Sequence, residues 1–276
     1  MPLSVSLFLV QWAIGGSLLL WVTSRRRLVN LGYGLISKGV FAFMSGLAIW
    51  AAPSDPGWIR SIAILTTIAI VGTFILAYRK RKIGVSGQTE IAEQRSERVA
   101  QMTGIDRVAE DKVAGAEFNP VVDLVFIAPL FASVILLVLV ESGPLAAARI
   151  AAGTVLLGAL TDAMALGHWY LVQPGLPRVP LIELVRISGI ALVPATILLL
   201  VPPSITGVFT GVIDDGYNGL LGWFWVACVV ATAILLVLTE IALREKQYSA
   251  VMAATGLLYL AILTGFGVDL VARALL

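Results

Sequence analysis

Eight apolar segments, each long enough to cross a lipid bilayer, constrain this chain more than any other feature of its sequence. A bilayer core takes about 20 helical residues to span, and a helix satisfies its own backbone hydrogen bonds there. The segments cover residues 3–22, 29–50, 58–78, 121–140, 144–172, 180–201, 219–243 and 248–270. With 59% apolar and 13% charged residues, the composition also lies outside that of ordinary soluble domains. The sequence therefore predicts an all-α, polytopic membrane protein with eight transmembrane helices.

Basic residues are concentrated in alternate connections between these segments, at 25–27, 79–82, 178 and 244–246. Cytoplasmic loops carry the excess of Lys and Arg, so we expect both termini outside and the connection 79–119 in the cytoplasm. On that topology 14 Lys and Arg face the cytoplasm, and Arg60, Arg149 and Arg273 lie near the outer side. We expect a multi-pass protein of the plasma (inner) membrane.

The long charged connection divides the sequence into unequal parts. We expect a three-helix membrane segment at 1–78, a cytoplasmic charged linker at 79–119 and a five-helix segment at 120–276, forming one integral membrane domain. Good helix formers predict a short helix over 88–102. This helix is either simply solvated or a docking surface for a cytoplasmic subunit, and the basic residues 79–82 would also suit anionic lipid.

Composition excludes several classes of protein and site. A net charge of +2, with no basic stripe, argues against nucleic acid as a partner. Cys228 is the only cysteine, which excludes disulfide scaffolds, cysteine-ligated iron–sulfur clusters and Cys-rich zinc sites within this chain. His168 is the only histidine, so a bis-histidine haem cannot be built from this polypeptide alone. We therefore predict neither a metal site nor a haem within the chain.

Lys38 and Asp162 lie deep inside predicted spans. Lys38 is about nine residues into the second span, roughly 13 Å from its cytoplasmic edge. Asp162 is about ten residues from the cytoplasmic end of the fifth span, at nearly the same depth. Ionisable groups inside a membrane generally pair or face a cavity. We expect an intramembrane charge pair, which either fixes helix packing or handles a proton or ligand.

A second group of polar residues lies nearer the cytoplasmic face. His168 and Tyr170 precede a Pro/Gly turn, and Glu183 and Arg186 follow it in the first turns of the sixth span. Glu183 and Arg186 are three residues apart and can neutralise each other. Together the four side chains have the chemistry to hydrogen-bond a quinone carbonyl and exchange its proton. The alternative is an aromatic belt at the membrane interface beside a surface ion pair.

Three other groups of charges have simpler interpretations. Glu240 and Arg244, like Asp269 and Arg273, are four residues apart and are expected to neutralise each other at helix ends. Asp123 is close enough to the start of the fourth span to be interfacial. The adjacent acids at 214–215 lie in a Gly-rich loop and are expected to form a turn.

The opening segment Leu-Phe-Leu-Val-Gln-Trp-Ala-Ile-Gly-Gly at 7–16, and Leu-Gly-His at 166–168 before a Pro-rich turn, carry a resemblance to a known family. With the helix count and the expected position of the termini, they make the chain resemble the eight-helix membrane-anchor subunits of polysulfide reductase and dimethyl sulfoxide reductase. The resemblance implies two packed helical bundles, a quinol site between helices and a soluble redox partner.

Three functions follow as hypotheses. The first is a membrane subunit that interacts with quinone, or another lipid-soluble ligand, in an electron-transfer complex with a soluble or membrane redox partner. The alternative is a small-solute or ion transporter using Lys38 and Asp162, in which Pro129 and Pro194 kink their spans. A lipid-modifying membrane enzyme is the third, although the sequence contains no Asp-rich diphosphate motif, nucleophile elbow or HExxH.

Overall fold

The computed structural model describes residues 4–52, 55–103, 115–140, 143–173, 175–202 and 205–275, and every regular element in these ranges is a helix. Eight helices are long and apolar enough to cross a membrane. They are α1 (Val5–Ser24), α2 (Leu31–Ala51), α3 (Gly57–Arg79), η1 (Pro120–Phe126) continuing into α5 (Ile127–Val140), α6 (Gly143–Val172), α7 (Val179–Leu200), α9 (Leu220–Arg244) and α10 (Tyr248–Leu275). The prediction of an all-α multi-pass membrane protein with eight spans is confirmed.

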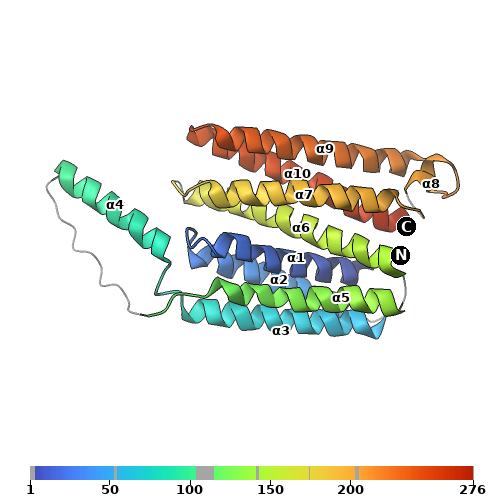
Figure 1. Ribbon diagram of the computed structural model, residues 1–276, viewed down its shortest axis with the longest axis horizontal. Coiled ribbons are helices and arrows are strands. Elements are labelled where there is room, and N and C mark those ends of the chain that lie inside the picture. The colour runs from blue at the N-terminus through green and yellow to red at the C-terminus, as the bar shows by residue number, and fades with distance from the viewer. Residues whose placement is uncertain are drawn as a thin grey trace.

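The spanning helices form two groups of four that lie side by side (Figure 1). We call α1, α2, α3 and α5 the N-terminal half, and α6, α7, α9 and α10 the C-terminal half. The helix α5, which follows the long connection, packs against α1 and α3 of the first three helices and also along α6. The central helices α1 and α6 have the largest buried shares of the eight. The boundary between the halves therefore runs chiefly along α1 and α6.

The two ends of the bundle differ in what they carry. The described parts of the N- and C-terminal helices finish at one end, together with the small helix α8 (Thr206–Phe209), and α4 (Ser86–Thr103) projects from the other (Figure 1). We call these the termini end and the α4 end. The basic connections at 25–27, 79–82, 178 and 244–246 all lie at the α4 end. That this end faces the cytoplasm stays a prediction from the positive-inside rule.

Small residues bring α1 and α6 into close contact. A Cβ atom added to Gly15 would overlap the carbonyl oxygen of Thr154, and one added to Gly158 would overlap the backbone of Gly15. Glycine allows backbones to approach to this distance in membrane proteins, where van der Waals packing holds helices together. Neither position tolerates a larger residue without a shift of the helices, so Gly15 and Gly158 set the spacing of the two halves.

The start of the fourth span is a 3-10 helix rather than an α-helix. The side chain of Asn119 accepts a hydrogen bond from the Val121 amide at 3.1 Å, and η1 then runs to Phe126. Because α5 begins only at Ile127, Pro129 falls in its first turn. Backbone amides in the first turn have no acceptor within the helix, so proline, which lacks an amide hydrogen, is tolerated there. The expected kink at Pro129 within a span is replaced by this change of helix type, whereas Pro194 does lie inside α7.

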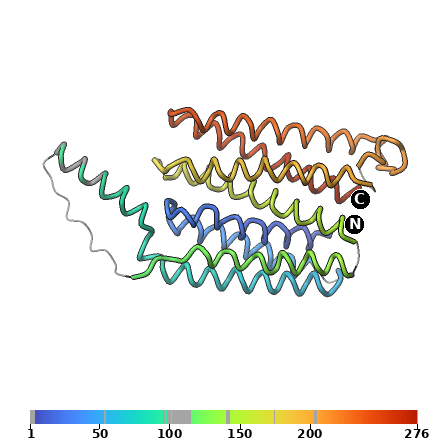
Figure 2. The backbone as a smooth tube through the Cα atoms, in the orientation of Figure 1, coloured from blue at the N-terminus to red at the C-terminus, as the bar shows by residue number. Residues whose placement is uncertain are grey.

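The helix α4 projects from the bundle but is attached at its base (Figure 2). It occupies the region where the sequence predicts a helix at 88–102. Its first turn contacts the ends of both halves, since the Gly87 amide donates to the Arg27 carbonyl at 3.2 Å and Gln173 donates to the side chain of Gln88 at 2.8 Å. The linker therefore contributes to the surface that closes the α4 end.

Candidate functional site

Lys38 of α2 forms a buried ion pair with Asp123 of η1. The ammonium nitrogen lies 2.9 Å from Oδ1 of Asp123, and the two side chains are 2% and 0% exposed. The Ser24 hydroxyl donates to the other carboxylate oxygen at 3.0 Å, and the Lys38 ammonium lies 5.2 Å from the centre of the Phe118 ring. The pair is thus removed from solvent and lipid, and all of these groups belong to the N-terminal half or the linker.

Asp162 of α6 is the nearby buried acid of the C-terminal half. Its side chain is completely buried, and neither carboxylate oxygen has a hydrogen-bond partner among the described residues. The Tyr33 hydroxyl donates to its backbone carbonyl at 3.2 Å, which fixes α2 against α6 here. Both Lys38 and Asp123 are close enough to interact electrostatically with the Asp162 carboxylate. We call Lys38, Asp123 and Asp162 the inner charge cluster.

The direct pair expected between Lys38 and Asp162 is replaced by a pair with Asp123. Side chains on a helix lean toward its N-terminus. The N-terminus of α2 is at the α4 end, and the Lys38 ammonium accordingly lies back along its own helix near Gly34. Because α6 runs in the opposite direction, the short side chain of Asp162 leans away from the α4 end. Equal depth of the two backbones therefore does not bring the charged atoms together.

A small cavity separates the inner charge cluster from the α4 end. Its volume is about 30 Å³, and Tyr33, Lys38 and Asp123 form its inner wall. Val85 and Phe118, which flank the projecting part of the linker, line it nearer the α4 end and are themselves buried. A cavity needs about 10 to 15 Å³ to hold one water molecule. The cavity can therefore hold one or two water molecules in contact with the ion pair.

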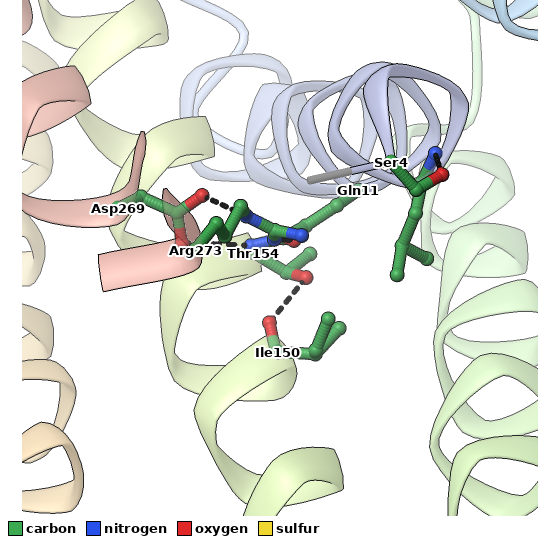
Figure 3. Close-up of polar contacts among 7 residues, drawn as sticks. Ser4, Gln11, Ile150, Thr154, Asp269 and Arg273 are labelled. Carbon is green, nitrogen blue, oxygen red and sulfur yellow. Dashed lines mark hydrogen bonds and ion pairs between the residues drawn. The ribbon is translucent and has the colours of Figure 1, made fainter. Parts of the chain in front are cut away.

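A second buried polar group joins the halves at the termini end. Arg273 of α10 donates through Nε to Asp269 at 2.6 Å and through a terminal nitrogen to the side chain of Gln11 on α1 (Figure 3). Gln11 in turn donates to the second oxygen of Asp269 at 3.5 Å. A Cβ atom on Gly153 of α6 would overlap the side-chain ends of Gln11 and Asp269, so a larger residue there would displace both groups. We call Gln11, Asp269 and Arg273 the terminal polar ring.

His168 and Tyr170 make separate contacts. His168 is exposed on the surface of α6, where its Nδ1 lies 3.2 Å from the hydroxyl of Tyr259 on α10. Tyr170 is buried and donates its hydroxyl to the Pro177 carbonyl at 2.7 Å. Residues two positions apart on a helix point in nearly opposite directions. The two side chains therefore do not converge on one place.

Glu183 and Arg186 also have different partners, although they lie three residues apart on α7. Glu183 pairs with Arg25 and Arg26 at the end of α1, with Arg26 Nε at 2.9 Å. Arg186 pairs with Glu240 of α9, also at 2.9 Å. Because α7 packs against α1 and α9, each residue takes a partner from a different neighbour. The structure thus distributes the four residues expected at a quinone site over four separate contacts.

The two pairs expected at helix ends are confirmed and extended. Arg244 lies 2.8 Å from Glu240, which also binds Arg186. Arg273 lies 2.6 Å from Asp269 within the terminal polar ring. The sequence pattern at i and i+4 identifies these pairs because both partners lie on one helix face. It contains no information about Arg186, which comes from another helix.

Sequence reasoning missed Asp123 and Gln11 as members of buried clusters. Asp123 was expected at the interface, but it lies on the side of η1 that faces Lys38. Its signal in the sequence is an acid inside the apolar run, three residues after an Asn-Pro helix start. Gln11 is an uncharged amide in the first span, and no spacing rule connects it with residues 269 and 273. Polar residues inside spans were the available signal in both cases.

No family model, curated protein or solved structure matches the chain. Within the described ranges, no group of three or more His, Cys, Asp or Glu side chains is placed to hold a metal ion. The inner charge cluster is the candidate site that the geometry favours, because it combines complete burial, an unequal number of acids and bases, and an adjoining cavity.

Proposed function

We propose that this protein is a membrane transporter in which proton binding at the inner charge cluster is coupled to the movement of a small solute or ion. The observation that carries the proposal is the position of the three charged groups. Lys38 and Asp123 come from the N-terminal half, Asp162 comes from the C-terminal half, and all three are buried where the halves meet. Intramembrane ionisable residues commonly mark substrate pathways and proton relays.

Charge balance supports the choice of a proton. The cluster contains one cation and two carboxylates, and Lys38 is already bonded to Asp123. If all three groups are charged, the cluster carries one uncompensated negative charge inside the membrane, which is costly. A proton on Asp162 removes that charge without disturbing the ion pair. Binding and release of this proton therefore change the electrostatic energy between the halves.

The cavity indicates the side from which the proton arrives. It connects Lys38 and Asp123 with residues near the α4 end, including Asn30 and Arg27. On the topology expected from the basic connections, this end faces the cytoplasm. One or two waters in the cavity would carry a proton to the ion pair, which interacts electrostatically with Asp162. The cluster is therefore expected to exchange protons with the cytoplasm in this conformation.

Polar contacts that join the halves at both ends of the bundle support a mechanism of alternating access. At the α4 end, Arg25 and Arg26 of α1 hold Glu183 of α7. At the termini end, the terminal polar ring connects α1 with α10. The close contact between Gly15 and Gly158 lies between these two connections. Because both connections are formed in this structure, we propose that the halves tilt about this contact so that either connection can open while the other stays closed.

Proton entry into proteoliposomes tests the proposed function. The purified protein is reconstituted with the pH dye pyranine inside, and a potassium diffusion potential drives proton entry. We expect faster acidification than in protein-free vesicles, and Asp162→Asn should reduce the rate toward that of the empty vesicles. Glu240→Gln is the control, because Glu240 lies outside the cluster and pairs with arginines at the α4 end. An unchanged rate in Asp162→Asn would contradict the proposal.

Distances between spin labels test the tilting of the halves separately. One labelled pair replaces the exposed residues Arg79 and Ser249 at the α4 end, and another replaces Trp50 and Tyr217 at the termini end, with Cys228→Ser as background. Between acidic and alkaline buffers we expect the two distances to change in opposite directions, and Asp162→Asn to abolish the change. If both distances stay constant while protons still enter, the halves do not tilt and only the mechanism is wrong.

A specific observation also favours a second function, a quinone-interacting subunit of an electron-transfer complex. His168 and Tyr259 form a hydrogen-bonded pair on an exposed surface of two spanning helices. Such a surface would be reached from the lipid, and an imidazole and a phenol can both donate to a quinone carbonyl. Lipid extraction of the purified protein should then yield quinone, and His168→Ala should weaken binding of a quinone analogue. Binding that does not depend on His168 would exclude this site.

A further inference from the structure

A second, larger cavity lies at the α4 end of the C-terminal half, away from the inner charge cluster. Its volume is about 200 Å³, and its wall includes Tyr170, Arg178, Lys246 and Tyr248. The residues come from the ends of α6 and α10 and from the two connections beside them. Lys246 and Tyr248 are exposed, whereas Tyr170 is buried. The cavity is thus a recess between helix ends at the level where lipid headgroups would lie.

Arg178 makes one wall of this cavity rigid. Its guanidinium donates to the carbonyls of Leu243, Lys246 and Gln247 at 3.1, 3.0 and 2.9 Å, and also to that of Glu245. These carbonyls are at the C-terminal end of α9 and in the following turn, where they lack partners within the helix. Arg178 therefore stabilises the α9–α10 connection and places a permanent positive charge at the cavity.

Lys246 supplies a second cation, and its ammonium group has unused hydrogen-bond donors. Within the described part of the chain, no hydrogen bond or ion pair engages its ammonium group. The tyrosine hydroxyls are already used as donors, since Tyr170 donates to Pro177 at 2.7 Å and Tyr248 to Leu171 at 3.3 Å. Their oxygens still accept hydrogen bonds. The cavity thus offers donors for an anion from Lys246 and acceptors for hydroxyl groups from the two tyrosines.

We propose that this cavity binds the phosphate headgroup of an anionic phospholipid, with phosphatidylglycerol as the best match. Its phosphate would bind Lys246 beside the charge of Arg178, and its glycerol hydroxyls would donate to the tyrosines. Basic recesses between transmembrane helices bind acidic headgroups in this way. The surfaces next to the cavity also suit a lipid rather than free phosphate, because they expose apolar side chains. Val172 follows Leu171, whose carbonyl binds Tyr248, and Met252 follows Val251, which lines the cavity. Acyl chains would lie along these faces.

Native mass spectrometry of the whole protein in detergent tests the proposal. The probes are dioleoyl phosphatidylglycerol, dioleoyl phosphatidylcholine and inorganic phosphate. We expect a discrete bound phosphatidylglycerol, little phosphatidylcholine, and an increase in melting temperature with phosphatidylglycerol only. Lys246→Gln should weaken phosphatidylglycerol binding about fivefold, the effect of one basic side chain near a headgroup, and Lys246→Arg should retain it. Lys82→Gln is the control, because Lys82 is an exposed cation at the same end but outside the cavity.

Each other outcome overturns the proposal. If Lys246→Gln and Lys82→Gln weaken binding equally, the lipid recognises only the overall positive charge of this end. If inorganic phosphate raises the melting temperature as phosphatidylglycerol does, the cavity binds a free anion instead. Equal binding of phosphatidylcholine would show that the phosphate charge is not recognised. Because Lys246 is exposed, its replacement should leave the fold intact, and the test needs no transport measurement.

Discussion

The terminal polar ring and the inner charge cluster both bury an ion pair beside the contact between α1 and α6. In the ring, one cation, one anion and one amide bond to one another in a closed cycle. In the cluster, the single cation serves one of two acids, and the second acid, Asp162, has no hydrogen-bond partner among the described residues. A satisfied buried network rigidifies a structure, whereas an unbalanced one responds to a proton. The difference separates a structural contact from a candidate site.

Removal of the lysine should have the largest effect. Lys38→Met leaves two carboxylates buried without a cation, and we expect the free energy of unfolding to fall by about 4 kcal/mol. The measurement is thermal or denaturant unfolding of the purified protein in detergent. The double variant Lys38→Met with Asp123→Asn should recover much of the loss, because it removes the orphaned charge as well. A double variant no more stable than Lys38→Met would show that the lost stability does not come from the unpaired Asp123 carboxylate.

Enlarging Gly15 should have the next largest effect, because this residue lies between the two clusters. Gly15→Leu forces side-chain atoms into the Thr154 backbone, and we expect a loss of about 3 kcal/mol from overpacking. Gly39→Leu on α2 is the matched control, since nothing lies within 4 Å of a Cβ there. Unfolding in detergent measures both. Equal free energies of unfolding for the two variants would mean that α1 and α6 can move apart without loss of stability.

Neutralising the acids of the two clusters compares them directly. Asp269→Asn removes an anion that accepts bonds from Arg273 and Gln11, and we expect a loss of about 2 kcal/mol. Asp162→Asn breaks no side-chain hydrogen bond among the described residues and replaces the carboxylic acid by a group of the same size, so we expect it to lower the free energy of unfolding less than Asp269→Asn does. Infrared difference spectra between acidic and alkaline buffer should lose the C=O band of a carboxylic acid only in Asp162→Asn. The reverse pattern would identify the terminal polar ring as the titrating group.

The smallest effect is expected at Asp215, a half-buried acid in the loop before α9 whose carboxylate accepts several backbone hydrogen bonds. The backbone amide of Gly219, followed by those of Tyr217 and Leu221, donates to Asp215 and lowers the pKa of its carboxyl. A lowered pKa in the folded state stabilises the loop above the ordinary value of about 3.9, and this contribution is lost as the pH falls through the lowered value.

Hydrogen exchange of the loop 215–221 measures this contribution. Protection should decrease toward low pH in the wild type and be lower at neutral pH in Asp215→Asn. Asp214→Asn is the control, because Asp214 accepts a single backbone bond, from Gly216. If protection of the loop depends neither on residue 215 nor on pH, the hydrogen bonds to Asp215 do not stabilise the loop.

Local patterns in the sequence predicted much of the architecture but only part of the candidate site. Glu240 with Arg244, and Asp269 with Arg273, were predictable because helical spacing alone brings them together. The depth of Lys38 and Asp162 in their spans indicated buried charges, and both side chains are buried in the structure. The bond from Lys38 to Asp123 was not predictable in the same way, because it depends on the opposite directions of two helices and on the 3-10 turn before α5.

By itself, the sequence determined the all-helical class, the eight spans and the concentration of basic residues at alternate connections, because bilayer thickness and backbone hydrogen bonding leave a long apolar segment few choices. Only the tertiary structure decided that α5 packs against α1 and α3, that Lys38 binds Asp123, and that Glu183 and Arg186 take partners from different helices. Those contacts depend on the rotation and direction of neighbouring helices, which packing fixes and which no spacing along one chain records.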